Sequence, residues 1–276
     1  MAAPARVAFA RSPRLPSYRK PPVGEVVAGV VFEQAIPDFL IGHVGLFWNR
    51  LMKDFPHSQH FGPFVAVGGE PRWLDSVTGL PLPRVWLLSK SKHELIQLQG
   101  DCFFFNWRKL SDSDVYPRYP SIISSFEKHL REFVRFLHDQ DFPEPKPMLC
   151  ELTYTNYVLK GAGWKSVEDI EGIFKDFCWT QTKGRFLKTP GAVSWTAAFD
   201  LPNKFGTLTA KLLQATRRTD STPTLRLDLI ARGINEATNV SELRPWFDLA
   251  HEWIVEGFTD LTTPKAQKDL WEREDA

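Results

Sequence analysis

Histidines are the residues of this sequence best suited to metal chemistry, and their spacing does not complete a metal site. His251 begins the sequence HEWIV, which matches the start of the zinc-protease pattern H-E-x-x-H, but Val255 stands where the second histidine ligand is needed. His43, His57 and His60 have a weak metal spacing and are better explained as surface residues. We therefore expect no metal site.

The other catalytic patterns are equally incomplete. Residues 161–166, GAGWKS, are similar to a phosphate-binding loop, but Trp164 occupies a position that needs glycine for close backbone approach. A turn and a helix start explain them better, since Asp169 follows Ser166 by three positions, close to a capping box. No serine lies in a G-x-S-x-G elbow, and no cysteine and histidine share the context of a nucleophile. The sequence therefore favours a non-enzymatic protein without a cofactor.

A binding surface is the alternative to catalysis, and the stretch DCFFFNWRKL, residues 101–110, is one candidate. In a strand, alternation puts Phe103, Phe105 and Trp107 on one face and Phe104 on the other. If Phe104 joins a helix-covered core, the remaining rings need a cover from the rest of the chain, a partner protein or stacked bases. We favour a cover from the chain itself, so we expect this strand to lie inside the protein, packed between parts of the same chain.

A polar strand face in the second half of the chain is the other candidate. Leucines at every second position from 225 to 229 alternate with Arg226 and Asp228. In the same way Thr207, Thr209 and Lys211 alternate with apolar residues. Arg226 and Asp228 share one face, so a cross-strand ion pair is the default explanation for these two charges. The face is either solvated or a platform on which hydroxyls and cations orient a ligand.

The predicted interaction or ligand surface combines both candidates with Tyr116 and Arg118, which lie in the loop after residues 101–110. Its residues are Phe103, Phe105, Trp107, Arg108, Lys109, Tyr116, Arg118, Thr207, Thr209, Lys211, Arg226 and Asp228. A partner protein or a homo-oligomer is the expected occupant. Nucleic acid is the first alternative, bound on a saddle-shaped sheet surface by the cations Arg108, Lys109, Lys211, Arg217, Arg218 and Arg226. The second alternative is a small ligand or substrate in a pocket between helix and sheet.

The elements that must position these residues follow the same order twice. Alternation predicts strands over 25–33, 84–88, 94–99 and 102–107, and again over 149–159, 192–199, 206–216 and 224–231. Helical spacing of apolar residues predicts helices over 44–55, 121–139 and 243–258, a helix starting at 166 and a short one after Pro264. Weaker strand signals lie at 72–74, within a Gly- and Pro-rich loop, and at 179–183.

This order predicts an α+β fold of two tandem β-α-β(3-4)-α modules, each a curved antiparallel sheet with long helices on one face. The predicted boundaries are a disordered basic and proline-rich arm over 1–22, a first module over 23–141, a linker over 142–147, a second module over 148–261 and a helical tail over 262–276. The sequence leaves open whether the two sheets join edge to edge or face each other.

Composition points to a cytoplasmic protein. The formal net charge is +1, so bulk electrostatics indicate neither nucleic acid nor membrane, and any such site must be a local patch. The three cysteines are far apart and odd in number, which fits a reducing compartment. No apolar run approaches the length that spans a bilayer, so we expect no membrane association.

Seven short segments in order carry a family resemblance. They are PPVGEVV at 21–27, HVGLFW at 43–48, PRVW at 83–86, LIQLQ at 95–99, FNWR at 105–108, YPRY at 116–119 and FTDLT at 258–262. The series resembles a sporadically distributed, uncharacterised family of bacterial proteins of about this length, most specifically in the first half. That resemblance implies an accessory factor of a defence-type system and supplies no catalytic residues. The element order is similar to tandem modules of the TATA-binding-protein kind, at the level of fold alone.

Overall fold

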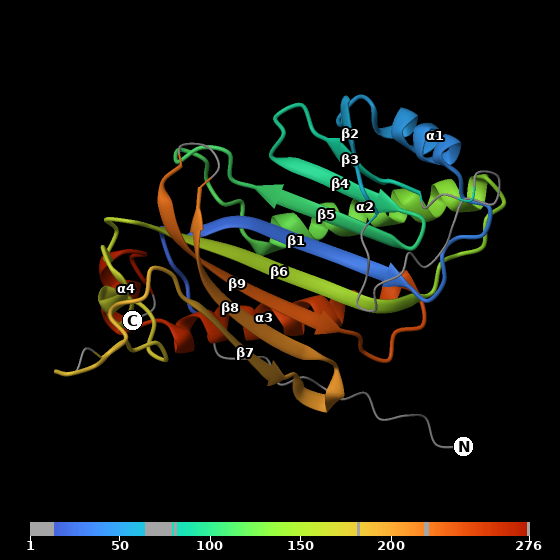
Figure 1. Cartoon of the computed structure of the whole chain (residues 1–276). Helices are drawn as coiled ribbons and strands as arrows, with labels where there is room; N and C mark the ends of the chain where they lie inside the picture. The colour runs from blue at the N-terminus through green and yellow to red at the C-terminus, as the bar shows by residue number, and fades with distance from the viewer. Residues whose placement is uncertain (1–13, 64–78, 80–81, 181–182, 218–220, 275–276) are drawn as a thin grey trace, which may run out of the picture.

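A computed structural model describes residues 14–63, 79, 82–180, 183–217 and 221–274. Nine strands form one antiparallel sheet in the order β2-β3-β4-β5-β1-β6-β9-β8-β7 (Figure 1). The strands are β1 (Val23–Phe32), β2 (His57–Phe61), β3 (Arg84–Leu88), β4 (Glu94–Gln99), β5 (Cys102–Arg108), β6 (Pro147–Leu159), β7 (Ser194–Asp200), β8 (Thr207–Thr216) and β9 (Pro223–Gly233). The predicted α+β class with an antiparallel sheet is confirmed.

The first strand of each half of the chain lies at the centre of the sheet. β1 pairs with β6, so the two halves join edge to edge and do not face each other. Outward from this pair, the first half continues through β5, β4, β3 and β2, and the second half continues through β9, β8 and β7. Strands that follow one another in the sequence are mostly neighbours here, as expected for hairpin connections.

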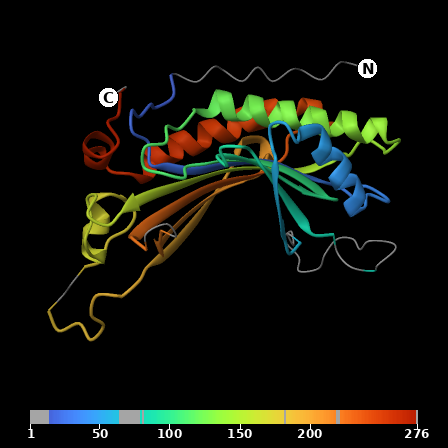
Figure 2. The ribbon, with the colours of Figure 1, turned by 90° about the horizontal axis from the view of Figure 1, so that it is seen from above.

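The described part of the chain has four α-helices beside the sheet, and the two long ones lie on the same face of it (Figure 2). They are α1 (Ile41–Leu51), α2 (Tyr119–Asp139), α3 (Arg244–Leu261) and α4 (Pro264–Asp269), with short 3-10 turns η1 (Val167–Gly172), η2 (Pro202–Lys204) and η3 (Val240–Glu242). We call the opposite side of the sheet the open face. Among the described residues, no helix is long and apolar enough to cross a bilayer.

The main core lies between the long helices and the sheet. α2 presents Phe126 and Phe133 to the sheet because they recur at helical spacing, and Phe133 stacks on Phe103 of β5 with ring centroids 5.5 Å apart. Phe126 also meets Phe247 of α3 at 4.9 Å, so the helices pack on each other as well as on the sheet. Burial of such rings stabilises a fold by roughly 1.5–3 kcal/mol each.

A small second cluster lies on the open face. Cys102 and Phe104 of β5 are buried against Val31 of β1 without a helix above them. Gly29 stands opposite Phe104 in the register, and a Cβ on Gly29 would lie 1.9 Å from the Phe104 ring. The absent side chain therefore leaves the space in which the Phe104 ring lies across the neighbouring strand.

Three local expectations differ from the structure. β2 occupies His57–Phe61, where the sequence predicts no strand, because this short edge strand is polar and mostly exposed. The helix predicted from residue 166 is only the 3-10 turn η1, although Ser166 and Asp169 do form the expected capping box. The segments 72–74 and 181–182 lie outside the described residues, and residues 179–180 belong to no strand.

The described part of the N-terminal arm is attached to the C-terminal end of the chain. Tyr18 is 5% exposed and forms an isolated β-bridge with Arg273. The Tyr18 hydroxyl lies 2.8 Å from the Thr259 hydroxyl of α3, and Lys20 forms an ion pair with Glu272. The expectation of a disordered arm is therefore wrong for residues 14–22, while residues 1–13 lie outside the described residues.

Candidate functional site

The rings predicted to form an interaction surface are in the core. Phe103 and Phe105 are fully buried and Trp107 is 5% exposed, all on the face that α2 covers. Phe105 stacks on His129 of α2, with ring centroids 5.7 Å apart. These rings therefore form no surface, and the cover comes from the chain itself. Phe104 is the ring that lies on the open face.

A row of charged and polar side chains crosses the open face at right angles to the strands. The register pairs Arg108 of β5 with Glu25 of β1, and Glu25 with Thr155 of β6. It continues from Thr155 to Asp228 of β9 and on to Lys211 of β8. We call these five residues the polar row. The cations Arg108 and Lys211 lie at the two ends of the row, and each is next to an acid on the neighbouring strand, Glu25 or Asp228. Attraction within these two pairs stabilises the arrangement.

The Asp228 carboxylate is held in place from two strands. Asp228 is 5% exposed, and its Oδ1 atom accepts hydrogen bonds from the Thr155 hydroxyl and from Arg226 Nε, each 2.8 Å long. Arg226 and Asp228 pair within β9, so the expected ion pair exists but is not cross-strand. A second pair does cross strands: Arg232 Nε donates to Glu151 at 2.7 Å.

A chain of hydrogen bonds fixes the other end of the polar row. Trp86 Nε1 donates to Gln97 at 2.9 Å, Gln97 Nε2 donates to Asn106 at 2.7 Å, and Asn106 Nδ2 donates to Glu25 Oε1 at 2.7 Å. This chain runs from β3 through β4 and β5 to β1. Each side-chain amide has both a donor and an acceptor partner, which fixes its orientation.

Rings and guanidinium groups gather at the outer end of this hydrogen-bond chain. The Arg84 guanidinium carbon lies 5.6 Å from the Phe61 ring centroid and 5.7 Å from that of Trp86. The Arg108 guanidinium carbon lies 5.6 Å from the centroid of the same Trp86 ring. Cation–π attraction of this kind is strongest where the groups lose water. The open face therefore carries an aromatic and cationic end and a threonine-rich end.

Glu25 is the carboxylate on the open face whose ionisation is most disfavoured. Burial raises its pKa above the ordinary glutamate value, while the hydrogen bond from Asn106 and the charges of Arg108 and Arg226 act in the opposite direction. A raised pKa in the folded state means that the stability associated with the protonated form is present at low pH. That stability is lost as the pH rises through the folded-state pKa.

Replacing Glu25 with glutamine should stabilise the protein slightly at neutral pH. Glutamine keeps an acceptor for Asn106 and removes a desolvated charge, so we expect a gain of up to about 1 kcal/mol at pH 7 and a smaller gain at pH 5. Urea unfolding at both pH values measures this, with the exposed Glu33→Gln as control. A loss of more than about 1 kcal/mol would instead show that Arg108 and Arg226 stabilise the Glu25 carboxylate.

The remaining predicted residues lie in two places. Thr207, Thr209 and the exposed Lys211 lie on the open face beside β9, as expected. Tyr116 and Arg118 lie elsewhere, at the start of α2, where they line a cavity of about 160 Å³. Among the additional cations proposed for nucleic acid, Lys109 is exposed, Arg217 pairs with Asp112 and Arg218 lies outside the described residues.

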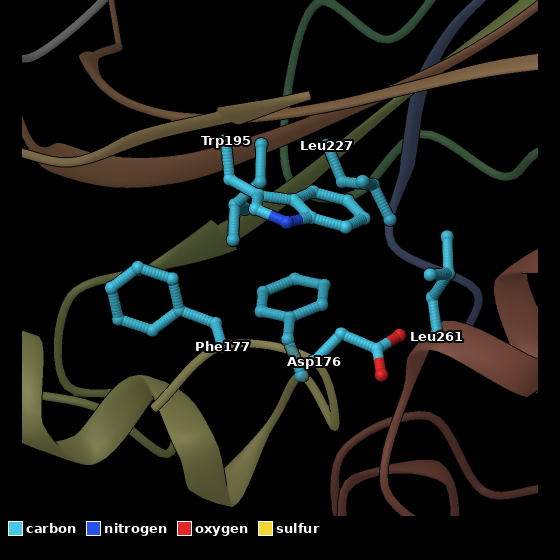
Figure 3. Close-up of a pocket in the computed structure, with 7 residues that line it drawn as sticks. Asp176, Phe177, Trp195, Leu227 and Leu261 are labelled. Carbon is cyan, nitrogen blue, oxygen red and sulfur yellow. The ribbon is translucent and has the colours of Figure 1, made fainter. Parts of the chain in front are cut away.

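Two of the hollows lined by described residues lie on the helix side of the sheet, and the larger of these two has room for a ligand. The smaller, shown in Figure 3, is about 10 Å³ in volume and is lined by apolar residues such as Phe177, Trp195 and Leu227, with Asp176 at its side. Such a space holds about one water molecule. No group of three or more histidine, cysteine, aspartate or glutamate residues in the described chain could hold a metal ion.

Sequence reasoning missed the residues that organise the open face. Glu25 and Glu151 fall within the predicted strands 25–33 and 149–159, but the sequence does not show what they meet, because convergence across strands depends on register. Sequence reasoning assigned no role to Gln97 or Asn106, which are ordinary in isolation and become partners only through β4 and β5. Compared with models of known protein families and with curated proteins, the chain matches none.

Proposed function

We propose that this chain is a non-enzymatic binding protein built from two related α+β modules, with the open face as its partner side. The mirrored strand order around β1 and β6 supports the two modules. In Figure 2 the outer strands of both halves turn away from the long helices, which supports a curved sheet with a hollow open face. A role in a defence-type system, which the family resemblance implies, stays a prediction.

One observation carries this proposal: the polar row is ordered before any partner arrives. Within the row, Asp228 is nearly buried and accepts a hydrogen bond from Thr155, and Glu25 accepts one from the nearly buried Asn106 beside the row. A partner that binds such a surface loses less side-chain entropy than one that must order it. A sheet face that meets only water does not require its side chains to be held in place. The chain of side-chain hydrogen bonds from β3 to β1 therefore favours a partner side.

The charges of the open face favour a polypeptide over a nucleic acid. Arg226 and Arg232 are already neutralised by Asp228 and Glu151, and Glu25 adds a further acid at the centre. A nucleic acid would bring a line of phosphates toward these carboxylates and gain little from paired arginines. An extended protein segment that carries side chains of both signs can complement both the acids and Lys211.

Site-specific photo-crosslinking tests the partner side. A benzophenone amino acid at Thr209 on the open face is expected to yield a polypeptide adduct in native lysate that nuclease leaves intact. The same probe at Arg131, exposed on the outer side of α2, is the matched control and is expected to yield none of that adduct. Lys211→Glu should reduce adduct formation at position 209 several-fold, because it reverses one charge of the polar row.

Two results would overturn the proposed partner side. Equal yields of the polypeptide adduct from probes at positions 209 and 131 would show that the partner does not prefer the open face to the helix side. Adducts that nuclease removes would favour the nucleic-acid alternative, and binding of labelled oligonucleotides should then weaken steeply as salt is added.

A further inference from the structure

A cavity remote from the open face carries an independent inference. It lies on the helix side of the sheet, between the described part of the N-terminal arm, the start of α2 and one side of α3. Its volume is about 160 Å³. Among the residues that line it are Tyr116, Arg118, Tyr119, Tyr154, His251 and Val255.

The size and lining of the cavity suit one aromatic ring. An engineered apolar cavity of about 150 Å³ in another protein binds benzene, so a volume of this size admits a six-membered ring. Tyr119 and His251 form a parallel stack with centroids 3.9 Å apart and planes 7° apart, and apolar residues such as Ile254 and Phe258 supply more of the wall. Aromatic side chains in a cavity wall can stack on a planar ligand.

Three side chains give the cavity one adaptable hydrogen-bonding chain. The Tyr154 hydroxyl lies 3.0 Å from the Tyr116 hydroxyl and 3.1 Å from His251 Nδ1. Burial lowers the pKa of His251 to about 4 and raises that of Tyr116 to about 12, so both are neutral near pH 7. A neutral chain of this kind can reverse the direction of all its hydrogen bonds, so Tyr116 can either donate to a ligand or accept from it.

Arg118 places a positive charge at the cavity, while the Asp248 carboxylate behind Tyr119 is paired with Arg244. Arg118 is exposed, lines the cavity and donates from Nη2 to the Tyr18 carbonyl. It precedes the 21-residue helix α2, whose first turn has neither an acidic side chain nor a side-chain cap, so the positive end of that helix is not neutralised. None of the described residues that line the cavity is acidic. Arg118 also has a φ of 70°, an uncommon conformation for arginine that places its side chain at this position.

We propose that this cavity binds a small aromatic carboxylate, with the ring inside and the carboxylate beside Arg118 and the start of α2. The ring replaces water in a largely apolar space, and the guanidinium group and the helix end stabilise the negative charge. The volume of about 160 Å³ matches one substituted ring. This site shares no residue with the polar row.

Titration calorimetry of the full chain with benzoate tests the proposal. Benzoate is expected to bind saturably and at least about tenfold more tightly than phenol, which has the ring without the charge, or acetate, which has the charge without the ring. Absence of benzoate binding at about 10 mM would overturn the proposal, and so would equal affinity for acetate.

Two variants and a control locate the binding. Arg118→Asn removes the cation, and at φ 70° and ψ 157° asparagine bears no more backbone strain than the arginine it replaces, so it should weaken benzoate at least about tenfold without unfolding the chain. Val255→Phe should fill the cavity and abolish binding, with circular dichroism to confirm folding. Arg131→Asn removes an exposed cation from the same helix and should change nothing. Binding that survives Val255→Phe, or that falls equally in both arginine variants, would place benzoate elsewhere and overturn the proposal.

Discussion

Replacing Phe103 with alanine is expected to lower the free energy of unfolding by about 3–5 kcal/mol. Phe103 is fully buried, stacks on Phe133 and also lies 6.3 Å from Phe126, both on α2. The substitution removes a large ring from the middle of a packed layer, and neighbouring rings on a strand and a long helix cannot collapse into the space. Chemical denaturation at neutral pH measures the loss.

The matched control is Phe186→Ala, because Phe186 is 95% exposed. Its effect on stability should stay within about 0.5 kcal/mol. If Phe103→Ala cost less than about 1 kcal/mol, the ring could not be packed under α2. The strand would then have to present its rings to a partner, and the assignment of the two sheet faces would be reversed.

Lowering the pH from 7 to 4 is expected to cost about 3 kcal/mol of stability through His129 alone. His129 is 7% exposed between Phe55 and Phe105, and its Nδ1 atom has no hydrogen-bond partner among the described residues. Burial, followed by the charge of Lys128, lowers the pKa of His129 to about 4. A base whose pKa falls on folding contributes stability above its unfolded pKa of about 6.5, and that stability is lost as the pH falls toward 4.

His129→Leu should therefore reduce the acid sensitivity of the protein. Urea unfolding at pH 7 and pH 4 gives the difference in free energy for the parent and the variant, and the variant should retain about 3 kcal/mol more at pH 4. The exposed His138→Leu on the same helix is the control and should not alter that difference. An unchanged pH dependence in His129→Leu would show that folding does not shift the pKa of this imidazole.

Periodicity predicted most of the elements but could not assign the two faces of β5. The strand limits 84–88 and 94–99 agree with β3 and β4 because Ser89 and Gly100, residues typical of turns, follow these largely apolar runs. In β5 both faces carry large rings, so alternation separates Phe103 from Phe104 without saying which one meets a helix. The deciding residue is Gly29, which lies far away in sequence and provides space for Phe104.

The candidate sites depend on contacts that a single sequence does not contain. Glu25 and Asp228 become parts of one row only because Thr155 of β6 lies between them in the register. The cavity requires the arm, α2 and α3 to meet, and its buried chain links Tyr116 to His251 across the fold. Arg118 was identified from its neighbouring rings, although its position beside a cavity was not.

The central pairing of β1 with β6 has a consequence for how the chain is made. β1 has neighbours on both sides, but β5 is the only one of them that lies in the first half of the sequence. While the ribosome is still synthesising the second half, the backbone groups of β1 that face β6 have no permanent partner. Such an edge can associate with other newly made chains. A delay in translation before β6 would therefore endanger this protein more than an equal delay after it.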